Sequence, residues 1–287
     1  MIKKRIPNLK NNEIKVKSEK MPPSDPNLFQ PYCRVSISGQ SGTGKSNAFL
    51  NAFERLYPYY DKVYIVSPTV YNDPKQQQAF MNRERIQVFD EPSLRDLIDI
   101  RAEIELKNEQ WREYQRVKKI YDRFVKSGYE ESSLKPSELC DLYKCDFNPY
   151  GMDMALDRKP NFCLFLDDLQ GLDILRHKIF ESMLIKLRHF CCNLFVCSQT
   201  FKGTSPVFRR NCTGFMIFRT VDSNQLKQIF EEVSGLFKNY EHFLELYKCA
   251  CAEKHDFLYI DTCSKQNPIR KNFDGVLIED DLESFRA

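Results

Sequence analysis

The sequence predicts an α/β fold with a mainly parallel central sheet flanked by helices. Short apolar runs typical of buried parallel strands recur along the chain. Amphipathic segments with helical spacing separate these runs, and polar residues suited to ligand binding directly follow several of them. The length of 287 residues suits one large α/β domain with insertions.

The first predicted strand, residues 34–38, leads into the most specific motif of the chain, and residues 47–56 after it suit a helix. The loop between them reads Gly39, Gln40, Ser41, Gly42, Thr43, Gly44, Lys45 and Ser46. This pattern predicts the phosphate loop of a nucleoside triphosphatase, in which glycines let backbone N–H groups face the phosphates. We expect Lys45 to reach the β- and γ-phosphates of ATP and Ser46 to coordinate Mg²⁺. The simpler alternative is a glycine-rich turn that only joins strand and helix.

Composition sets broad limits on the class of protein. No run reaches the apolar length of a membrane span, and the N-terminus lacks the apolar core of a signal peptide, so we expect a soluble intracellular protein. The eleven cysteines are then expected to be reduced thiols, and none forms the C-x-x-C pattern of a structural zinc site. The net charge of +3 is too small to indicate a nucleic-acid partner by itself.

Three regions are predicted. Residues 1–30 are a basic, flexible N-terminal arm that either contacts a polyanion or is simply solvated. Residues 31–263 are the ATPase domain, with a helical insertion at about 93–160, and residues 264–287 are a C-terminal tail that turns from basic to acidic.

The first half of the domain alternates strands and helices. Strands are expected over residues 62–67 and 86–89, with a short helix over 76–83 between them. The apolar spacing from Ser93 to Lys126 predicts one long amphipathic helix or two shorter ones. We expect this helical part to cover the surface or serve assembly, with simple core packing as the role of the side that carries Trp111. Residues 127–160 have weak periodicity and predict a linker or lid.

A second motif follows at residues 162–168, where an apolar run ends in Asp167 and Asp168. This Walker B pattern is typical of a buried strand whose acids emerge at the ligand-binding edge of the sheet. We expect Asp167 to hold Mg²⁺ and Asp168 to orient or deprotonate the attacking water. The alternative is an acidic turn after a strand. Many such enzymes have Glu at the second position, which weakens the assignment of the base.

The remaining elements follow the same alternation, and one carries a further candidate residue. A helix is expected over residues 173–190, and the strand at 193–197 is followed by Gln199, placed to sense the γ-phosphate and position the water. The further expected elements are a strand at 214–218, a helix from the Asp222 cap through 232, a helix at 240–252 and a strand at 256–261.

Four segments carry a family resemblance. They read, in chain order, GQSGTGKS, LFLDDL, LRHFCCNLFVCSQT and VFRRNCTGFMIFRT. This set resembles the FtsK/HerA superfamily of DNA-pumping ATPases, and most of all the poxvirus-type genome-packaging ATPases of large DNA viruses, virophages and related transposons, over about residues 33–220. The resemblance implies a RecA-like (ASCE) core in which the Gln199 strand lies between the strands of the two nucleotide motifs.

The resemblance also implies a hexameric or pentameric ring of identical subunits that threads double-stranded DNA. Arg188 then matches the arginine finger, which a neighbouring subunit inserts to stabilise charge on the transferring phosphoryl group. Arg209 and Arg210 are competing candidates, and each of the three has the alternative of binding DNA phosphate or capping a strand.

The leading functional hypothesis is therefore an ATP-hydrolysing motor that moves double-stranded DNA into a viral capsid, with a capsid or portal component as a further partner. Its location would be the host cytoplasm, a viral factory or the virion. One alternative is a helicase or a conjugation-type DNA-transfer ATPase. Another, from a different class, is an ATP-gated capsid-assembly protein without sustained turnover.

Overall fold

The computed structural model describes residues 25, 28–264 and 266–277. The described strands are β1 Arg34–Ser38, β2 Lys62–Val66, β3 Ile86–Phe89, β4 Phe162–Asp167, β5 Cys192–Ser198, β6 Gly214–Phe218, β7 Phe257–Asp261, β8 Ile269–Lys271 and β9 Gly275–Val276. The described α-helices are α1 Lys45–Leu56, α2 Pro74–Phe80, α3 Leu94–Lys126, α4 Pro136–Lys144, α5 Lys178–Phe190, α6 Pro206–Asn211, α7 Ser223–Val233 and α8 Tyr240–Ala250.

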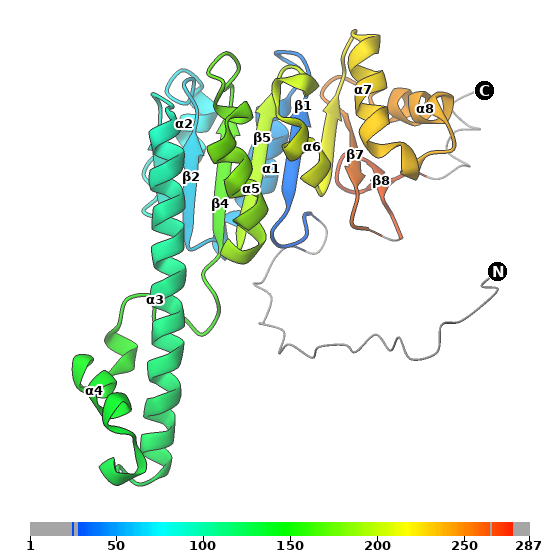
Figure 1. The fold of residues 1–287 in the computed structure, drawn as a ribbon. Coiled ribbons are helices and arrows are strands. Elements are labelled where there is room, and N and C mark those ends of the chain that lie inside the picture. Colours follow the sequence, from blue (N-terminus) through cyan, green and yellow to red (C-terminus); the bar gives the residue numbers. More distant parts are fainter. Residues whose placement is uncertain (1–24, 26–27, 265, 278–287) are drawn as a thin grey trace, which may run out of the picture.

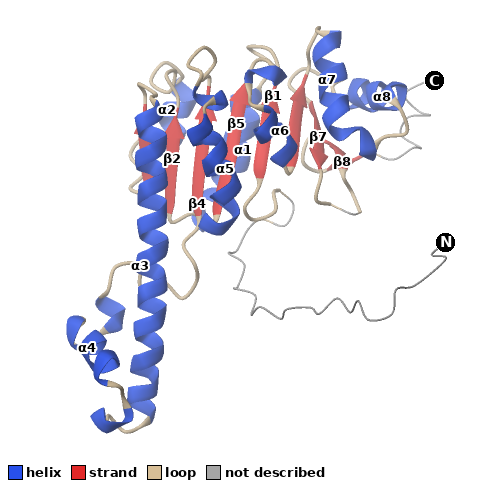
Figure 2. Cartoon of the chain, viewed as in Figure 1, coloured by secondary structure: helices blue, strands red, loops and turns tan. Residues whose placement is uncertain are grey.

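These strands form one sheet in the order β3-β2-β4-β5-β1-β6-β7-β8-β9 (Figure 2). Neighbouring strands from β3 through β6 are parallel, and the pairs from β6 through β9 are antiparallel. The prediction of a mainly parallel sheet flanked by helices is confirmed. Strand β5 lies between β1 and β4, as the family resemblance implied.

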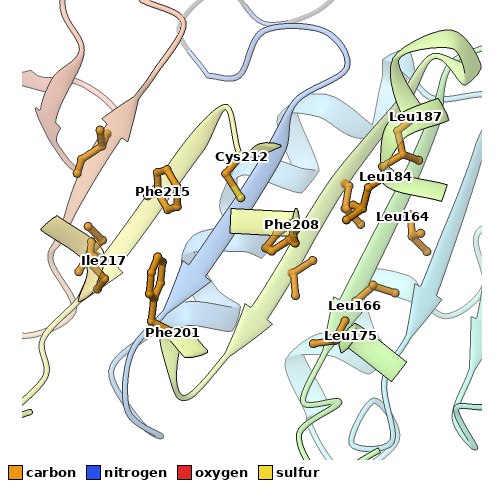
Figure 3. Packing of buried hydrophobic residues seen from close by; sticks show 14 of the residues in the cluster. Leu164, Leu166, Leu175, Leu184, Leu187, Phe201, Phe208, Cys212, Phe215 and Ile217 are labelled. Atoms are coloured by element: carbon orange, nitrogen blue, oxygen red, sulfur yellow. The ribbon is translucent and has the colours of Figure 1, made fainter. Parts of the chain in front are cut away.

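Helices cover both faces of the sheet, which explains why the central strand β4 is almost wholly apolar. On β4, Cys163 and Phe165 pack in the core that includes α1, while Leu164 and Leu166 pack with α5 on the opposite face (Figure 3). The rings of Phe165 and Phe49 of α1 stack at a centroid separation of 3.7 Å. Burial on both faces removes the polar alternation expected of a half-exposed strand.

Helix α3 is one continuous helix that begins beside the sheet and extends beyond it (Figure 1). Its start is fixed by a capping box in which Ser93 and Asp96 satisfy each other's backbone N–H groups, and Gly128 follows its end with φ of 77°. The first half packs against α5, where Arg101 donates to Ser182 at 3.3 Å. The prediction of a long helix from Ser93 to Lys126 is confirmed in its single-helix form.

The second half of α3 forms a projection together with α4, and the projection has its own small core. Val117, Ile120 and Phe124 of α3 pack there against Leu142 of α4. The weak periodicity of residues 127–160 predicted a linker or lid, and the structure has the helix α4 within that range. That helix has Pro136 in its first turn, a position that suits proline because its missing N–H has no helical partner.

Several predicted boundaries differ from the structure. The helix expected over 76–83 is α2, which starts earlier because the Asp73 side chain accepts the N–H of Lys75. The helix expected from 173 starts at Lys178. Asp173 adopts a left-handed conformation, a short 3-10 turn follows, and His177 caps α5.

Both predicted terminal regions contribute to the core or the sheet where they are described. Leu28 and Phe29 are buried, and the Phe29 ring lies 5.1 Å from that of Phe195. Residues 1–24 and 26–27 of the predicted arm lie outside the described residues. The region predicted as a tail from 264 supplies β8, which pairs with β7, and β9. No described helix combines the length and apolar composition that a membrane span requires.

Candidate nucleotide site

The predicted motifs meet in one pocket at the carboxyl edge of the parallel strands. The pocket has a volume of about 380 Å³, and its lining includes Lys45, Asp167, Asp168 and Gln199. These residues lie at or after the carboxyl ends of β1, β4 and β5, which are neighbours in the sheet. Parallel strands end at the same edge, so residues far apart in sequence converge there.

The loop after β1 has the backbone of a phosphate loop. Gly42 and Gly44 adopt φ of 77° and 105°, which other residues rarely reach, and Gly44 directly precedes α1. Gly39 is constrained by close packing, because a Cβ atom there would lie 2.5 Å from the Cβ of Phe218. The glycines therefore let the loop curl at the N-terminus of α1, where backbone N–H groups favour an anion.

Lys45 lies over this loop from the first turn of α1. Its Nζ donates to the carbonyl oxygens of Gly39 at 2.6 Å and Gln40 at 2.9 Å. Partial burial lowers the pKa of the Lys45 ammonium, and the nearby Asp167 and Asp168 oppose this shift. The ammonium group is thus held between the loop and the acids.

Asp167 is buried and is held by a residue that the sequence motifs did not reveal. The residue is 6% exposed, and Gln76 Nε2 of α2 donates to its Oδ2 at 3.0 Å. Burial raises the pKa of Asp167 to about 6, the hydrogen bond from Gln76 opposes the rise, and the neighbouring Asp168 adds to it. The Gln76 Oε1 atom is buried without a hydrogen-bond partner among the described residues.

Asp168 and Gln199 form a second pair beside Asp167. Gln199 Nε2 donates to Asp168 Oδ1 at 3.3 Å, and Asp168 itself has a left-handed backbone with φ of 52°. The loop that carries Gln199 is anchored by Gln170, whose amide oxygen, in the orientation that satisfies the hydrogen bonds, accepts the N–H groups of Gln199 and Thr200. A carboxylate and an amide so placed can together hold and orient a water molecule.

The fold is RecA-like and contains a phosphate loop. Its deciding features are the phosphate loop after β1, the paired acids after β4, and the Gln199 strand inserted between those two strands.

The oxygen atoms of the pocket fit a hydrated Mg²⁺ ion. Ser46 and Asp167 supply a hydroxyl and a carboxylate, which are ligands that Mg²⁺ prefers. Two further buried oxygens in the lining, Gln76 Oε1 and Ser198 Oγ, have no partner among the described residues, although buried polar atoms are normally paired. Within the described part, no group of three His, Cys, Asp or Glu side chains could hold a metal. The donor set thus suits an ion that keeps waters and binds phosphate.

His255 is another residue that the motifs did not reveal. It lies in the turn between α8 and β7, and its Nδ1 is 3.2 Å from the carbonyl oxygen of Thr43. Its ring lies against Gly44, where a Cβ atom would approach Nδ1 to 3.0 Å. A histidine 212 residues away thus supports the phosphate loop, and no local sequence signal indicates it.

The three arginine candidates lie in different settings. Arg188 lies near the C-terminal end of α5, and its side chain is outside the described part of the structure. Arg209 of α6 is held within its own chain, because it pairs with Glu232 at 3.2 Å and lies over the ring of Phe201. Arg210 is exposed. Among the latter two, only Arg210 could reach another molecule without breaking an existing ion pair.

No family model and no curated protein matches the chain. Several solved structures are similar in fold. The genome packaging NTPase B204 from Sulfolobus turreted icosahedral virus 2, in complex with AMP, aligns with a TM-score of 0.47 at 12% identity, over 87% of this chain and 100% of that chain. B204, the DNA-packaging ATPase from Sulfolobus turreted icosahedral virus, aligns with a TM-score of 0.48 at 13% identity, over 87% of this chain and 100% of that chain.

A third similar structure is the pCW3 conjugation coupling protein TcpA with ATPγS, with a TM-score of 0.45, 14% identity, and coverage of 90% of this chain and 66% of that chain. These proteins are of the kind that the sequence motifs resemble. Every one of these TM-scores is below 0.5.

Proposed function

We propose that this protein is a Mg²⁺-dependent ATPase that moves double-stranded DNA and packages a viral genome. The observation that carries the ATPase part is the convergence of Lys45, Asp167, Asp168 and Gln199 on one pocket beside the phosphate loop. The DNA and packaging part is supported by the residues and the order of the four sequence segments that resemble the DNA-packaging ATPases.

Each group of the pocket has a role in phosphoryl transfer. The loop N–H groups and the Lys45 ammonium bind the β- and γ-phosphates and stabilise their charge. Asp168 accepts a proton from the attacking water, and the Gln199 amide orients that water, consistent with the 3.3 Å contact between these side chains. Bound Mg²⁺, held by Ser46 and Asp167, would supply positive charge to the phosphate oxygens.

The arginine finger is proposed to come from a neighbouring subunit. Helix α5 leads into the start of β5, so Arg188 lies toward the amino edge of the sheet, whereas the pocket lies at the carboxyl edge. The seven residues of β5 separate these edges by about 20 Å. Arg188 would therefore complete the pocket of another copy in a ring, and Arg210 is the alternative.

The test of the ATPase is hydrolysis of ATP with Mg²⁺, with and without duplex DNA, in the wild type, Lys45→Ala and Asp168→Asn. We expect DNA-stimulated turnover in the wild type and at least a 100-fold loss in each variant, since each removes transition-state stabilisation or the base. Arg95→Ala, on the exposed start of α3, is the matched control and should retain turnover. Wild-type rates in either site variant would exclude the proposed site.

The test of the motor and finger uses subunit mixing. Wild-type subunits mixed with Arg188→Ala subunits should lose hydrolysis more steeply than the mixing ratio, because each altered subunit disables its neighbour. A loss proportional to the ratio would argue against action in trans. Translocation on duplex DNA is measured by displacement of a bound triplex strand, and ATP hydrolysis without displacement would point to a protein that does not translocate.

A further inference from the structure

The projection formed by α3 and α4 extends beyond the sheet (Figure 1). It contains a groove lined by residues of both helices. The groove has a volume of about 790 Å³, and its lining includes Trp111 and Ile120 of α3 and Ser137 of α4. Four basic residues of α3 line it at helical spacing. They are Arg112, Arg116, Lys119 and Arg123.

Only part of this positive charge is neutralised within the groove. Arg116 pairs with Asp141, and Arg123 pairs with Glu138 at 2.6 Å. Arg112 and Lys119 are exposed and make no ion pair with any described residue. Residues 111–158 as a whole contain equal numbers of basic and acidic residues, so the positive excess is specific to the groove. Ile120 is 6% exposed and belongs to the core of the projection, so the half-exposed indole of Trp111 is the main apolar surface beside the two unpaired cations. This combination suits a ligand that carries carboxylates and an apolar side chain.

One segment of this chain has that composition. Residues 279–283 read Glu-Asp-Asp-Leu-Glu, and the apolar residues Ile278, Leu282 and Phe285 recur at spacings of four and three. The acids complement the charge of Arg112 and Lys119, and an apolar side chain of the segment can pack on the indole of Trp111. We propose that the groove binds residues 278–285 of a second copy of this chain.

The same segment of one chain is too short to reach its own groove. The last described residues before it follow β9, at the opposite edge of the sheet from β3, after which α3 begins. Eight strand spacings amount to about 38 Å. The few residues from Leu277 to the acids span at most about 20 Å when fully extended. The contact therefore joins two copies, and it does not depend on the proposed ATPase activity.

The direct test is binding of a fluorescein-labelled peptide of residues 276–287 to the full chain, measured by fluorescence anisotropy. We expect saturable binding that weakens as salt rises. The double variant Arg112→Glu/Lys119→Glu should bind at least 10-fold more weakly. Lys126→Glu, on the same helix but outside the groove lining, should bind within twofold of the wild type. Matching thermal unfolding curves would show that each variant is folded.

A charge swap separates a specific contact from loss of structure. A peptide with Glu279→Lys and Asp281→Lys should bind poorly to the wild type and at least 10-fold better to the Arg112→Glu/Lys119→Glu chain. In the full chain, removal of residues 278–287 should reduce self-association in analytical ultracentrifugation. Lys45→Ala changes the nucleotide pocket and not the groove, so peptide binding should be unchanged in this variant. The peptide result is therefore independent of whether the protein hydrolyses ATP.

Three outcomes would overturn the proposal. The first is that the peptide shows no saturable binding at millimolar concentration, and the second is that it binds the wild type and the double variant equally. The third is that a short DNA duplex binds the wild type but not the double variant, while the peptide binds neither. The last result would assign the groove to nucleic acid.

Discussion

Replacing Asp167 with Asn should stabilise the metal-free protein while it removes hydrolysis. Asp167 is 6% exposed, and burial raises the pKa of its carboxyl from 3.8 to about 6. The native state therefore disfavours the charged form. Because each pKa unit is worth about 1.4 kcal/mol, ionised Asp167 costs the fold about 3 kcal/mol above pH 6. Asn has nearly the same shape, keeps an oxygen for Gln76 and carries no charge.

The sign of the pH dependence follows from proton binding. Between pH 3.8 and about 6 the native state holds more protons at Asp167 than the unfolded chain, so stability falls as pH rises through this range and then levels off. The variant lacks this loss. Its free energy of unfolding should exceed that of the wild type by up to about 3 kcal/mol at pH 8 and by only about 1 kcal/mol at pH 4.5.

The assay is urea unfolding of both proteins in EDTA without nucleotide, across pH 4.5–8. The expected difference at pH 8 corresponds to a rise in Tm of roughly 5–10 °C. Asp168→Asn, at a half-exposed position, is the control and should stay within about 0.5 kcal/mol of the wild type. A variant that is no more stable at pH 8, or one whose advantage is the same at pH 4.5, would refute this reasoning.

Three further predictions concern other positions. Gly39→Ala should cost on the order of 1–3 kcal/mol, because its Cβ would lie 2.5 Å from that of Phe218; an unchanged urea midpoint would contradict this. Ser93→Ala should lower the free energy of unfolding by about 1 kcal/mol through loss of the capping box while ATP turnover stays the same. Gln76→Leu removes the 3.0 Å hydrogen bond to Asp167, so half-maximal hydrolysis should need about tenfold more Mg²⁺, and an unchanged Mg²⁺ titration would count against a positioning role.

The parts of the site that could be predicted are those formed by residues that are contiguous in the sequence. The phosphate loop needs glycines at fixed spacing next to Lys45, and Asp167 ends an apolar strand, so local pattern was sufficient. The adjacency of the Gln199 strand to both motifs is a property of strand order, and only the family resemblance indicated it before the structure.

The parts that were missed depend on tertiary contacts or on weak local signals. Gln76 is one of three consecutive glutamines, and nothing in that run shows which side chain faces Asp167. His255 reaches the phosphate loop because β7 lies two strands from β1. Helix α4 did have a start signal in Pro136, but its short length and weak apolar spacing concealed it.

The continuity of α3 has a mechanical consequence. Its 33 residues give a rod about 50 Å long whose interior contains no proline or glycine, so bending it would break backbone hydrogen bonds. The half beside the sheet is held by its packing against α5, and the half carrying α4 extends from the domain. A tilt of 10° at the sheet would displace the far end by roughly 4–5 Å over its outer 25 Å. A small rotation of α3 at the sheet would therefore move α4 by several ångströms.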